Sequence, residues 1–142
     1  MRPLSSLVFA LFALALAAVS PATAAAEEPQ DAIRQVIESQ LAAFQRDDGA
    51  EAFSFAAPGI QRRFRDPDTF MQMVRSGYAP VYRPREVEFR NLRSRGETLQ
   101  QEVLFVGPEG EPVLALYTMQ QQADGSWRIA GVILLTAPDR MS

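Results

Sequence analysis

The side chains that could do chemistry in this chain are few in kind. Its 142 residues include no Cys and no His, and every basic residue is Arg rather than Lys. These absences remove thiol nucleophiles, the usual general base near neutral pH, Schiff-base lysines and the common zinc ligand sets. We therefore expect no metal and no cofactor, and catalysis would have to rest on carboxylates, Tyr, Ser or Thr.

Two pairs of neighbouring carboxylates could act as acid and base. Asp47 and Asp48 come directly before Gly49, between two predicted helices, while Asp66 and Asp68 flank a proline. Both positions are typical of helix N-terminal capping. Neither pair has the ligand spacing of a calcium loop. We interpret both pairs as caps rather than as catalytic groups.

Two uncharged polar residues fall on the predicted apolar face of the strands. Because successive strand side chains point to opposite sides, Gln101 shares a face with Val103, and Tyr117 shares one with Met119. The strand glutamates fall on the other face. A buried amide or phenol without a hydrogen-bond partner costs roughly 1 to 3 kcal/mol. The partner is either a ligand or another group of the protein, and the sequence leaves both open.

The segment 78–84 is rich in Tyr and Pro and is predicted to be an extended connector, because Pro80 and Pro84 do not continue a helix. It holds Tyr82 and Arg83. The connector either forms the rim of a pocket or is a rigid strap over the sheet edge. Tyr82, Gln101 and Tyr117 are the candidate ligand contacts.

The elements that must position these residues follow from periodicity. Helical spacing predicts three helices, over residues 31–46, 50–57 and 67–76, with a non-helical link after Pro58. Alternation then predicts four strands, over residues 85–93, 98–106, 113–121 and 127–136. Trp127, Ile129 and Ile133 share the inward parity of the last strand. The expected fold is α+β: three helices packed on a curved, cone-like antiparallel four-stranded meander, whose hollow is a default ligand site.

The first 26 residues are typical of a cleaved export signal, with Arg2 before the apolar run Leu7 to Val19 and small residues at 22–26. Thirteen apolar residues span about 20 Å as a helix, short of the roughly 30 Å hydrocarbon core. We expect a signal peptide (1–26), a single domain (27–142), a periplasmic or secreted location through the general secretory route, and no stable membrane anchoring after cleavage.

The charge of the chain limits its partners. The formal net charge is −3, and loss of Arg2 with the signal makes it one unit more negative. An acidic domain does not favour nucleic acid or an anionic membrane as a partner. We expect no nucleic acid, and instead a small-molecule ligand or a second copy of the chain.

Five segments together resemble one family: residues 40–44 (QLAAF), 52–58 (AFSFAAP), 70–78 (FMQMVRSGY), 80–84 (PVYRP) and 124–129 (DGSWRI). They are similar to the domain of unknown function 4864 family of secreted bacterial proteins, within the nuclear-transport-factor-2-like (cystatin-like cone) fold group. The family brings no assigned activity. The resemblance implies that fold, whose members include isomerases, dehydratases, binding modules and dimerising scaffolds, so the fold alone does not decide the function.

Three functions stay open. The first is a non-catalytic module that binds a small apolar or amphipathic ligand in its cone. The second is a scaffold that self-associates through the outer face of the sheet. The third is an isomerase- or lyase-like enzyme, which requires a carboxylate inside the cone.

Overall fold

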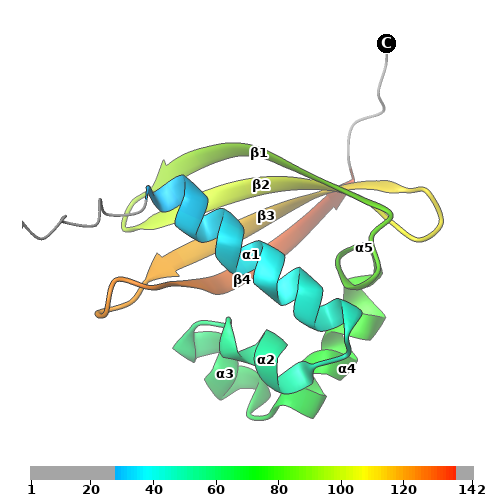
Figure 1. Cartoon of the computed structure of the whole chain (residues 1–142), viewed down its shortest axis with the longest axis horizontal. Coiled ribbons are helices and arrows are strands. Elements are labelled where there is room, and N and C mark those ends of the chain that lie inside the picture. The colour runs from blue at the N-terminus through cyan, green and yellow to red at the C-terminus, as the bar shows by residue number, and fades with distance from the viewer. Residues whose placement is uncertain (1–27, 137–142) are drawn as a thin grey trace, which may run out of the picture.

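The computed structural model describes residues 28–136, so the expected signal peptide and the tail from Ala137 lie outside the described residues. Helices come first and strands follow (Figure 1). The helices are α1 (Pro29–Gln45), α2 (Gly49–Ser54), α3 (Pro58–Phe64), α4 (Pro67–Gly77) and α5 (Ala79–Tyr82). The strands are β1 (Glu86–Arg95), β2 (Thr98–Val106), β3 (Pro112–Gln121) and β4 (Trp127–Thr136). The α+β class and the order of helices before a meander are confirmed.

The predicted caps account for two helix starts. The Asp48 carboxylate accepts a hydrogen bond from the Glu51 backbone N–H at 3.1 Å, and Asp66 accepts one from the Thr69 N–H at 2.8 Å. These bonds satisfy N–H groups that have no partner inside a helix. None of the helices within residues 28–136 is long and apolar enough to cross a membrane.

Two short helices stand where the sequence predicted irregular chain. The helix predicted over residues 50–57 already ends at Ser54. Pro58 begins the next helix, because Ala57 is extended and the proline takes the first position of α3. The predicted extended connector is likewise wrong over Ala79–Tyr82, which forms α5 with its proline near the start. In both places a proline read as a stop acts as a helix start.

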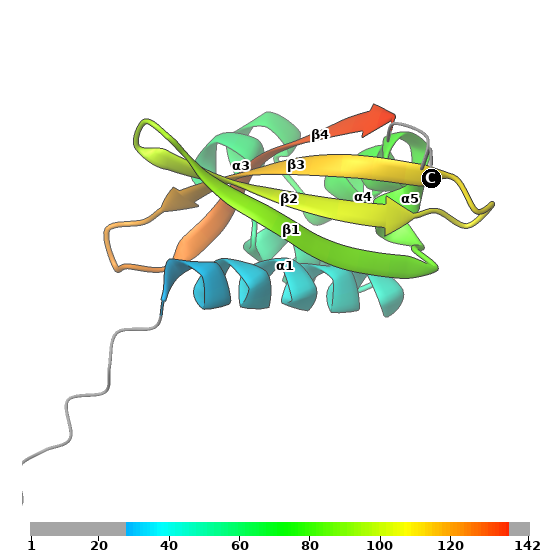
Figure 2. The same ribbon diagram turned by 90° about the horizontal axis from the view of Figure 1, so that it is seen from above.

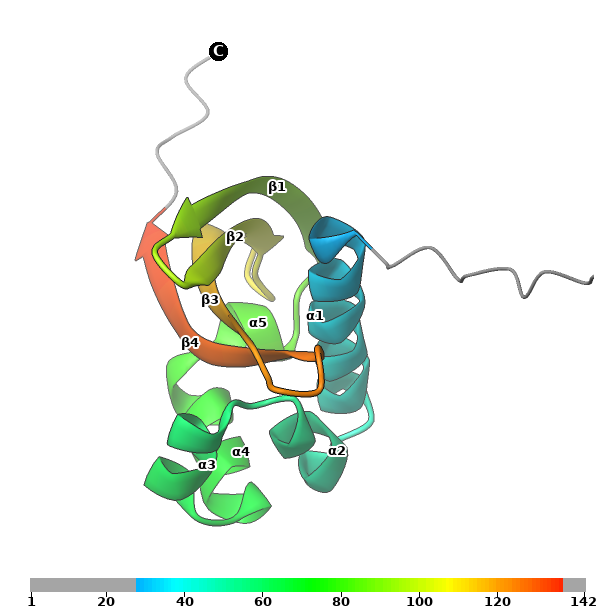
Figure 3. The same cartoon turned by 90° about the vertical axis from the view of Figure 1, so that its left-hand side faces the viewer.

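The four strands form one antiparallel sheet in the order β1-β2-β3-β4. α1 lies along the concave face of this sheet, and α2, α3 and α4 form a second group beside it (Figure 1). Viewed from above, the outer face of the sheet has no described helix over it (Figure 2). Seen from the end, the sheet curls from β1 round to β4 (Figure 3). One face of the sheet is therefore buried under helices and the other is open.

Bulges in the two edge strands change which side chains face the helices. On β4, Gly131 pairs with Thr118 and Ile129 pairs with Met119, so Ala130 is an extra residue. An extra residue reverses the alternation beyond it. The inward placement predicted for Ile133 is therefore wrong: its side chain is 58% exposed on the outer face. Val132 and Leu134 pack against the core instead.

The core lies between the concave face and the helices. Its largest fully buried side chains include Tyr117, Phe44, Phe105, Ile33 and Ile37.

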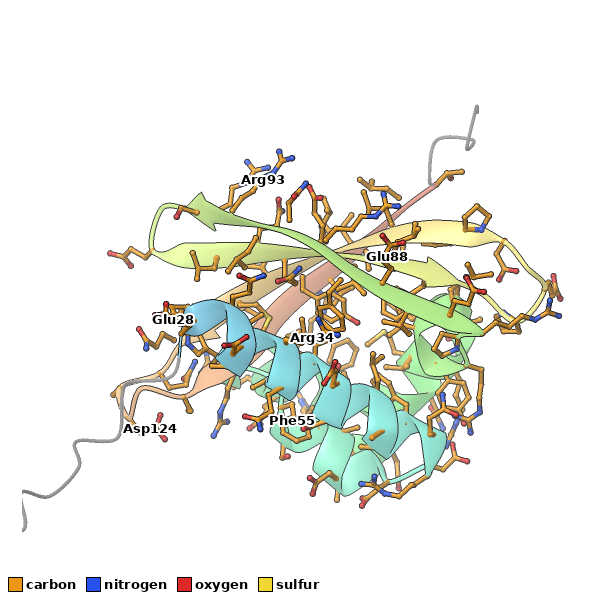
Figure 4. All side chains as sticks on the ribbon, turned by 45° about the horizontal axis from the view of Figure 1, so that its top comes forward. Glu28, Arg34, Phe55, Glu88, Arg93 and Asp124 are labelled. Carbon is orange, nitrogen blue, oxygen red and sulfur yellow. The ribbon has the colours of Figure 1, made fainter. Side chains whose placement is uncertain are left out.

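In Figure 4, Arg34 lies on α1 beneath β1, where its guanidinium stacks 4.7 Å from the centre of the Phe89 ring. Glu88 and Arg93 stand on β1, and each takes part in an ion pair, with Arg90 and Glu102 respectively. The Arg93–Glu102 pair joins β1 to β2, as cross-strand charge pairing predicts, whereas the Glu88–Arg90 pair lies within β1.

Candidate functional site

An apolar cavity of about 270 Å³ lies between the short helices and the end of the sheet formed by β3 and β4. α3 contributes Ile60, Arg63 and Phe64 to its wall. The remaining wall residues are Gln40, Phe44, Ala56, Phe70, Met73, Val74, Tyr78, Val81, Tyr117, Ile129, Ala130, Gly131 and Val132. The bulge at Ala130 is part of this wall. The cavity is thus formed by elements that sequence patterning identified and by three that it did not: α3, α5 and the β4 bulge.

Tyr117 is the most unusual group in the wall of the cavity. Its side chain is fully buried, and its hydroxyl is the one buried side-chain polar atom of the described residues that has no hydrogen-bond partner. Burial raises the pKa of the phenol far above its usual value, so the group stays protonated and able to donate. Leaving such a hydroxyl unpaired costs roughly 1 to 3 kcal/mol. A ligand that accepts this hydrogen bond recovers that cost.

Two other polar residues in the wall are already bound to the backbone. The Tyr78 hydroxyl donates to the Val132 carbonyl at 3.1 Å, which joins the end of α4 to β4. The buried amide of Gln40 donates from Nε2 to the Ala52 carbonyl at 3.1 Å, which joins α1 to α2. These two hydrogen bonds join the elements that form the cavity wall, whereas the Tyr117 hydroxyl forms no hydrogen bond within the described part of the chain.

Gln101 lies beside Tyr117, but its side-chain amide is hydrogen-bonded to backbone carbonyls. The two residues are paired across β2 and β3 and share the helix-facing side, as strand parity predicted. Gln101 Nε2 donates to the carbonyls of Arg90 (3.0 Å) and Glu102 (2.9 Å). Arg90 lies in the β1 bulge, where the register shifts between Phe89 and Leu92. Gln101 is not in the cavity wall, and its amide supplies a partner to the bulged strand.

Tyr82 lies outside the cavity wall too. Its hydroxyl donates to the Asp47 carboxylate, and the Arg83 guanidinium lies 3.9 Å from the centre of the Tyr82 ring. Arg83 and Arg75 also contact Asp47, at 3.1 and 3.6 Å. Asp47 is therefore not a cap, unlike Asp48: it ties the end of α1 to α4 and α5. The structure brings Gln101 and Tyr117 together and places Tyr82 in a separate surface cluster.

The wall includes no Asp or Glu. Over residues 28–136 no group of three or more potential metal-ligating side chains occurs. The carboxylate that an isomerase-like mechanism requires is therefore not in this wall. The wall is largely apolar, and its polar side chains without a partner among the described residues are the exposed Arg63 and the buried Tyr117.

Sequence reasoning missed Arg63 and Gln40 as parts of the site. A signal existed for Gln40, because it interrupts the apolar stripe of the first helix at a buried position. No comparable signal existed for Arg63, since its place in the wall depends on α3 being a helix.

Replacement of Gln101 by Leu should lower the free energy of unfolding by about 2 kcal/mol, because the Arg90 carbonyl in the bulge loses its side-chain partner. Urea denaturation measures this loss. The control is Gln100→Leu, whose side chain takes part in one long, exposed hydrogen bond and should change stability little. If Gln101→Leu is as stable as the parent protein, the amide is not structural.

Replacement of Asp47 by Asn should destabilise the protein in a pH-dependent way. The Tyr82 hydroxyl, followed by Arg83 and Arg75, holds the pKa of Asp47 below its ordinary 3.8. A lowered folded-state pKa adds stability above the unfolded-state pKa, and this is lost as the pH falls through the folded-state value. The stability gap between parent and variant should therefore be constant near neutral pH and shrink below about 3.8. Glu97→Gln, at an exposed turn, serves as the control. A gap that does not change with pH contradicts this role of Asp47.

Comparison with known proteins places the chain in one family. A search of the curated proteins found no match. The family model described as "Domain of unknown function (DUF4864)" matches residues 26–142, which include all the described helices and strands. This is the family that the sequence segments resemble, and the chain belongs to the DUF4864 family of domains of unknown function.

Proposed function

We propose that this chain is an exported, non-catalytic module that binds a small apolar or amphipathic ligand in the cavity beside Tyr117. The observation that carries the proposal is the Tyr117 hydroxyl, which is fully buried without a hydrogen-bond partner among the described residues and belongs to a residue in the wall of a largely apolar cavity. In folded proteins, a buried hydroxyl normally has a hydrogen-bond partner. A ligand acceptor supplies the missing partner. Export rests on the leader pattern in residues 1–26.

The size of the cavity limits the ligand. An engineered apolar cavity of about 150 Å³ holds one benzene ring, and the cavity here is about 270 Å³. It thus has room for a ligand of about two rings or an aliphatic chain of similar volume. Met73 and Phe64, which are only half-buried, lie in the wall and give it adjustable side chains. We therefore take 2-naphthol, which has two rings and one hydroxyl, as the probe.

Replacement of Tyr117 by Phe tests the proposal in two ways. Without ligand, the variant should gain about 1 kcal/mol, because it removes an unpaired buried hydroxyl. Its affinity for 2-naphthol should fall about fivefold, while its affinity for 2-methylnaphthalene, which has no hydroxyl, should be unchanged. Calorimetry and thermal unfolding measure these effects.

The matched control is Tyr78→Phe, in the same cavity wall. Its hydroxyl is bonded to the Val132 carbonyl, so this variant should lose stability where Tyr117→Phe gains it. Equal destabilisation by the two changes would show that the Tyr117 hydroxyl is paired within the fold. Absence of binding by either naphthalene to the parent protein would count against the binding function itself.

A second candidate function is self-association through the outer face of the sheet. Leu114 pairs with Leu135 across β3 and β4, and Leu116 pairs with Ile133 beside them. Leu104, opposite Leu114 on β2, is buried and adds little to this surface. Ile133 and Leu135 are 58% and 43% exposed. A two-fold partner would cover this patch with the same patch of a second copy. The patch favours a homodimer, which is compatible with a ligand in the cavity because the two lie on opposite faces.

Sedimentation equilibrium tests this second function. The parent protein should form a dimer, and Ile133→Glu should give a monomer, because the new charge would be buried in the interface. Gln120→Glu is the matched control: it adds the same charge at an exposed position of β3 outside the apolar patch. A parent protein that stays monomeric at high concentration rules out self-association.

A further inference from the structure

The end of α3 and the residue that follows it carry three arginines, one of which, Arg63, lies in the cavity wall. Arg62, Arg63 and Arg65 are all exposed, and they flank Phe64, which lies in the cavity wall together with Arg63. Within residues 28–136 none of the three guanidinium groups forms an ion pair. Arg34, Arg46, Arg75, Arg83, Arg90 and Arg93, by contrast, each have a carboxylate within 4.0 Å.

These arginines form a local positive cluster in a chain whose formal net charge is −3. Of the other arginines in the described part of the chain, six have a carboxylate within 4.0 Å, and Arg85, Arg95 and Arg128 have none. Cations near the end of a helix also interact favourably with its dipole, but that effect applies to Arg62 and Arg63 alike. Only Arg63 lies in the cavity wall. Arg63 can therefore place its positive charge beside a molecule in the cavity, whereas Arg62 is not in the wall.

The cavity thus has two polar points of different character. Tyr117 is fully buried, with a neutral hydroxyl that has no partner. Arg63 is exposed to solvent, with a positive charge that has no acidic partner in the described part of the chain. The wall between them is largely apolar and includes Ile60, Phe70 and Val74. A molecule that satisfies both points has an apolar body, an acceptor on its buried end and a negative charge at its exposed end.

We propose that the natural ligand is a small, largely apolar carboxylic acid that carries one hydrogen-bond acceptor on its buried end, toward Tyr117, and leaves its carboxylate at the mouth, paired with Arg63. This deepens the proposed binding function and rests on it. Guanidinium groups bind carboxylates through paired hydrogen bonds. Arg62 and Arg65 add to the positive potential that attracts the anion to the mouth.

The test compares two probes that differ only in charge. 6-Hydroxy-2-naphthoate carries a carboxylate, and 6-hydroxy-2-naphthamide replaces it with a neutral amide of nearly the same shape. Calorimetry on the parent protein should give a lower Kd for the carboxylate, by about tenfold, as expected for a charge-assisted hydrogen bond. This advantage should shrink as salt is raised, because the pair is at the surface.

Arg63→Gln should remove the advantage of the carboxylate and leave the amide bound as before. Arg62→Gln, one residue earlier on the same helix, should leave both Kd values within about twofold of the parent. Thermal unfolding of both variants should match the parent, because neither side chain is buried. This pair separates a ligand contact from a general effect of charge.

The possible outcomes separate a failure of the carboxylic-acid proposal from a failure of the proposed binding function. If both probes bind with equal Kd and Arg63→Gln changes neither, the ligand is not an acid and the inference is wrong, while the cavity remains a binding site. If Arg62→Gln and Arg63→Gln weaken the carboxylate equally, the contact assigned to Arg63 is wrong. If neither probe binds, the inference and the proposed function both fail.

Discussion

The structure depends on the need to cover the concave face of one curved sheet with apolar side chains. The chain has no Cys, so packing rather than disulfide bonds must hold the helices against that face. α1 covers it with one long stripe that buries Ile33, Ile37 and Phe44. The rest is covered by short helices, and short helices meet a curved surface less completely. The cavity beside β4 lies where α3, α4 and α5 complete the cover.

The polar groups on the concave face show how this cover is stabilised. Gln40 and Tyr78 donate to backbone carbonyls of other elements, and Gln101 donates to the bulged strand β1. Each of these hydrogen bonds joins one element of the fold to another. Tyr117 differs from them because its hydroxyl is buried with no partner. The fold pairs the buried amides of Gln40 and Gln101 and leaves the buried Tyr117 hydroxyl unpaired within the described residues, and this contrast supports the proposal that the hydroxyl meets a ligand.

The sequence predicted the overall plan because hydrophobic periodicity depends on local geometry. Strand alternation placed Gln101 and Tyr117 on the buried face, and the capping pattern placed Asp48 and Asp66 at helix starts. Two of the misses depend on contacts distant in sequence, and the others on the local ambiguity of proline. The β4 bulge that turns Ile133 outward is set by pairing with β3. The partner of Tyr82 is Asp47, 35 residues earlier in the chain, and no local pattern shows that pairing. The prolines of α3 and α5 were compatible with either a helix start or a stop.

The central claim is that the Tyr117 cavity holds a small molecule, and native mass spectrometry of the protein purified without denaturation from the cells that make it tests this most directly. Conditions gentle enough to retain an added 2-naphthol complex should be fixed first. Under those conditions the account predicts a species heavier than the polypeptide by one small molecule, and Tyr117→Phe should carry less of it. A protein that retains added 2-naphthol yet arrives from its cells with only the mass of the polypeptide would contradict the account.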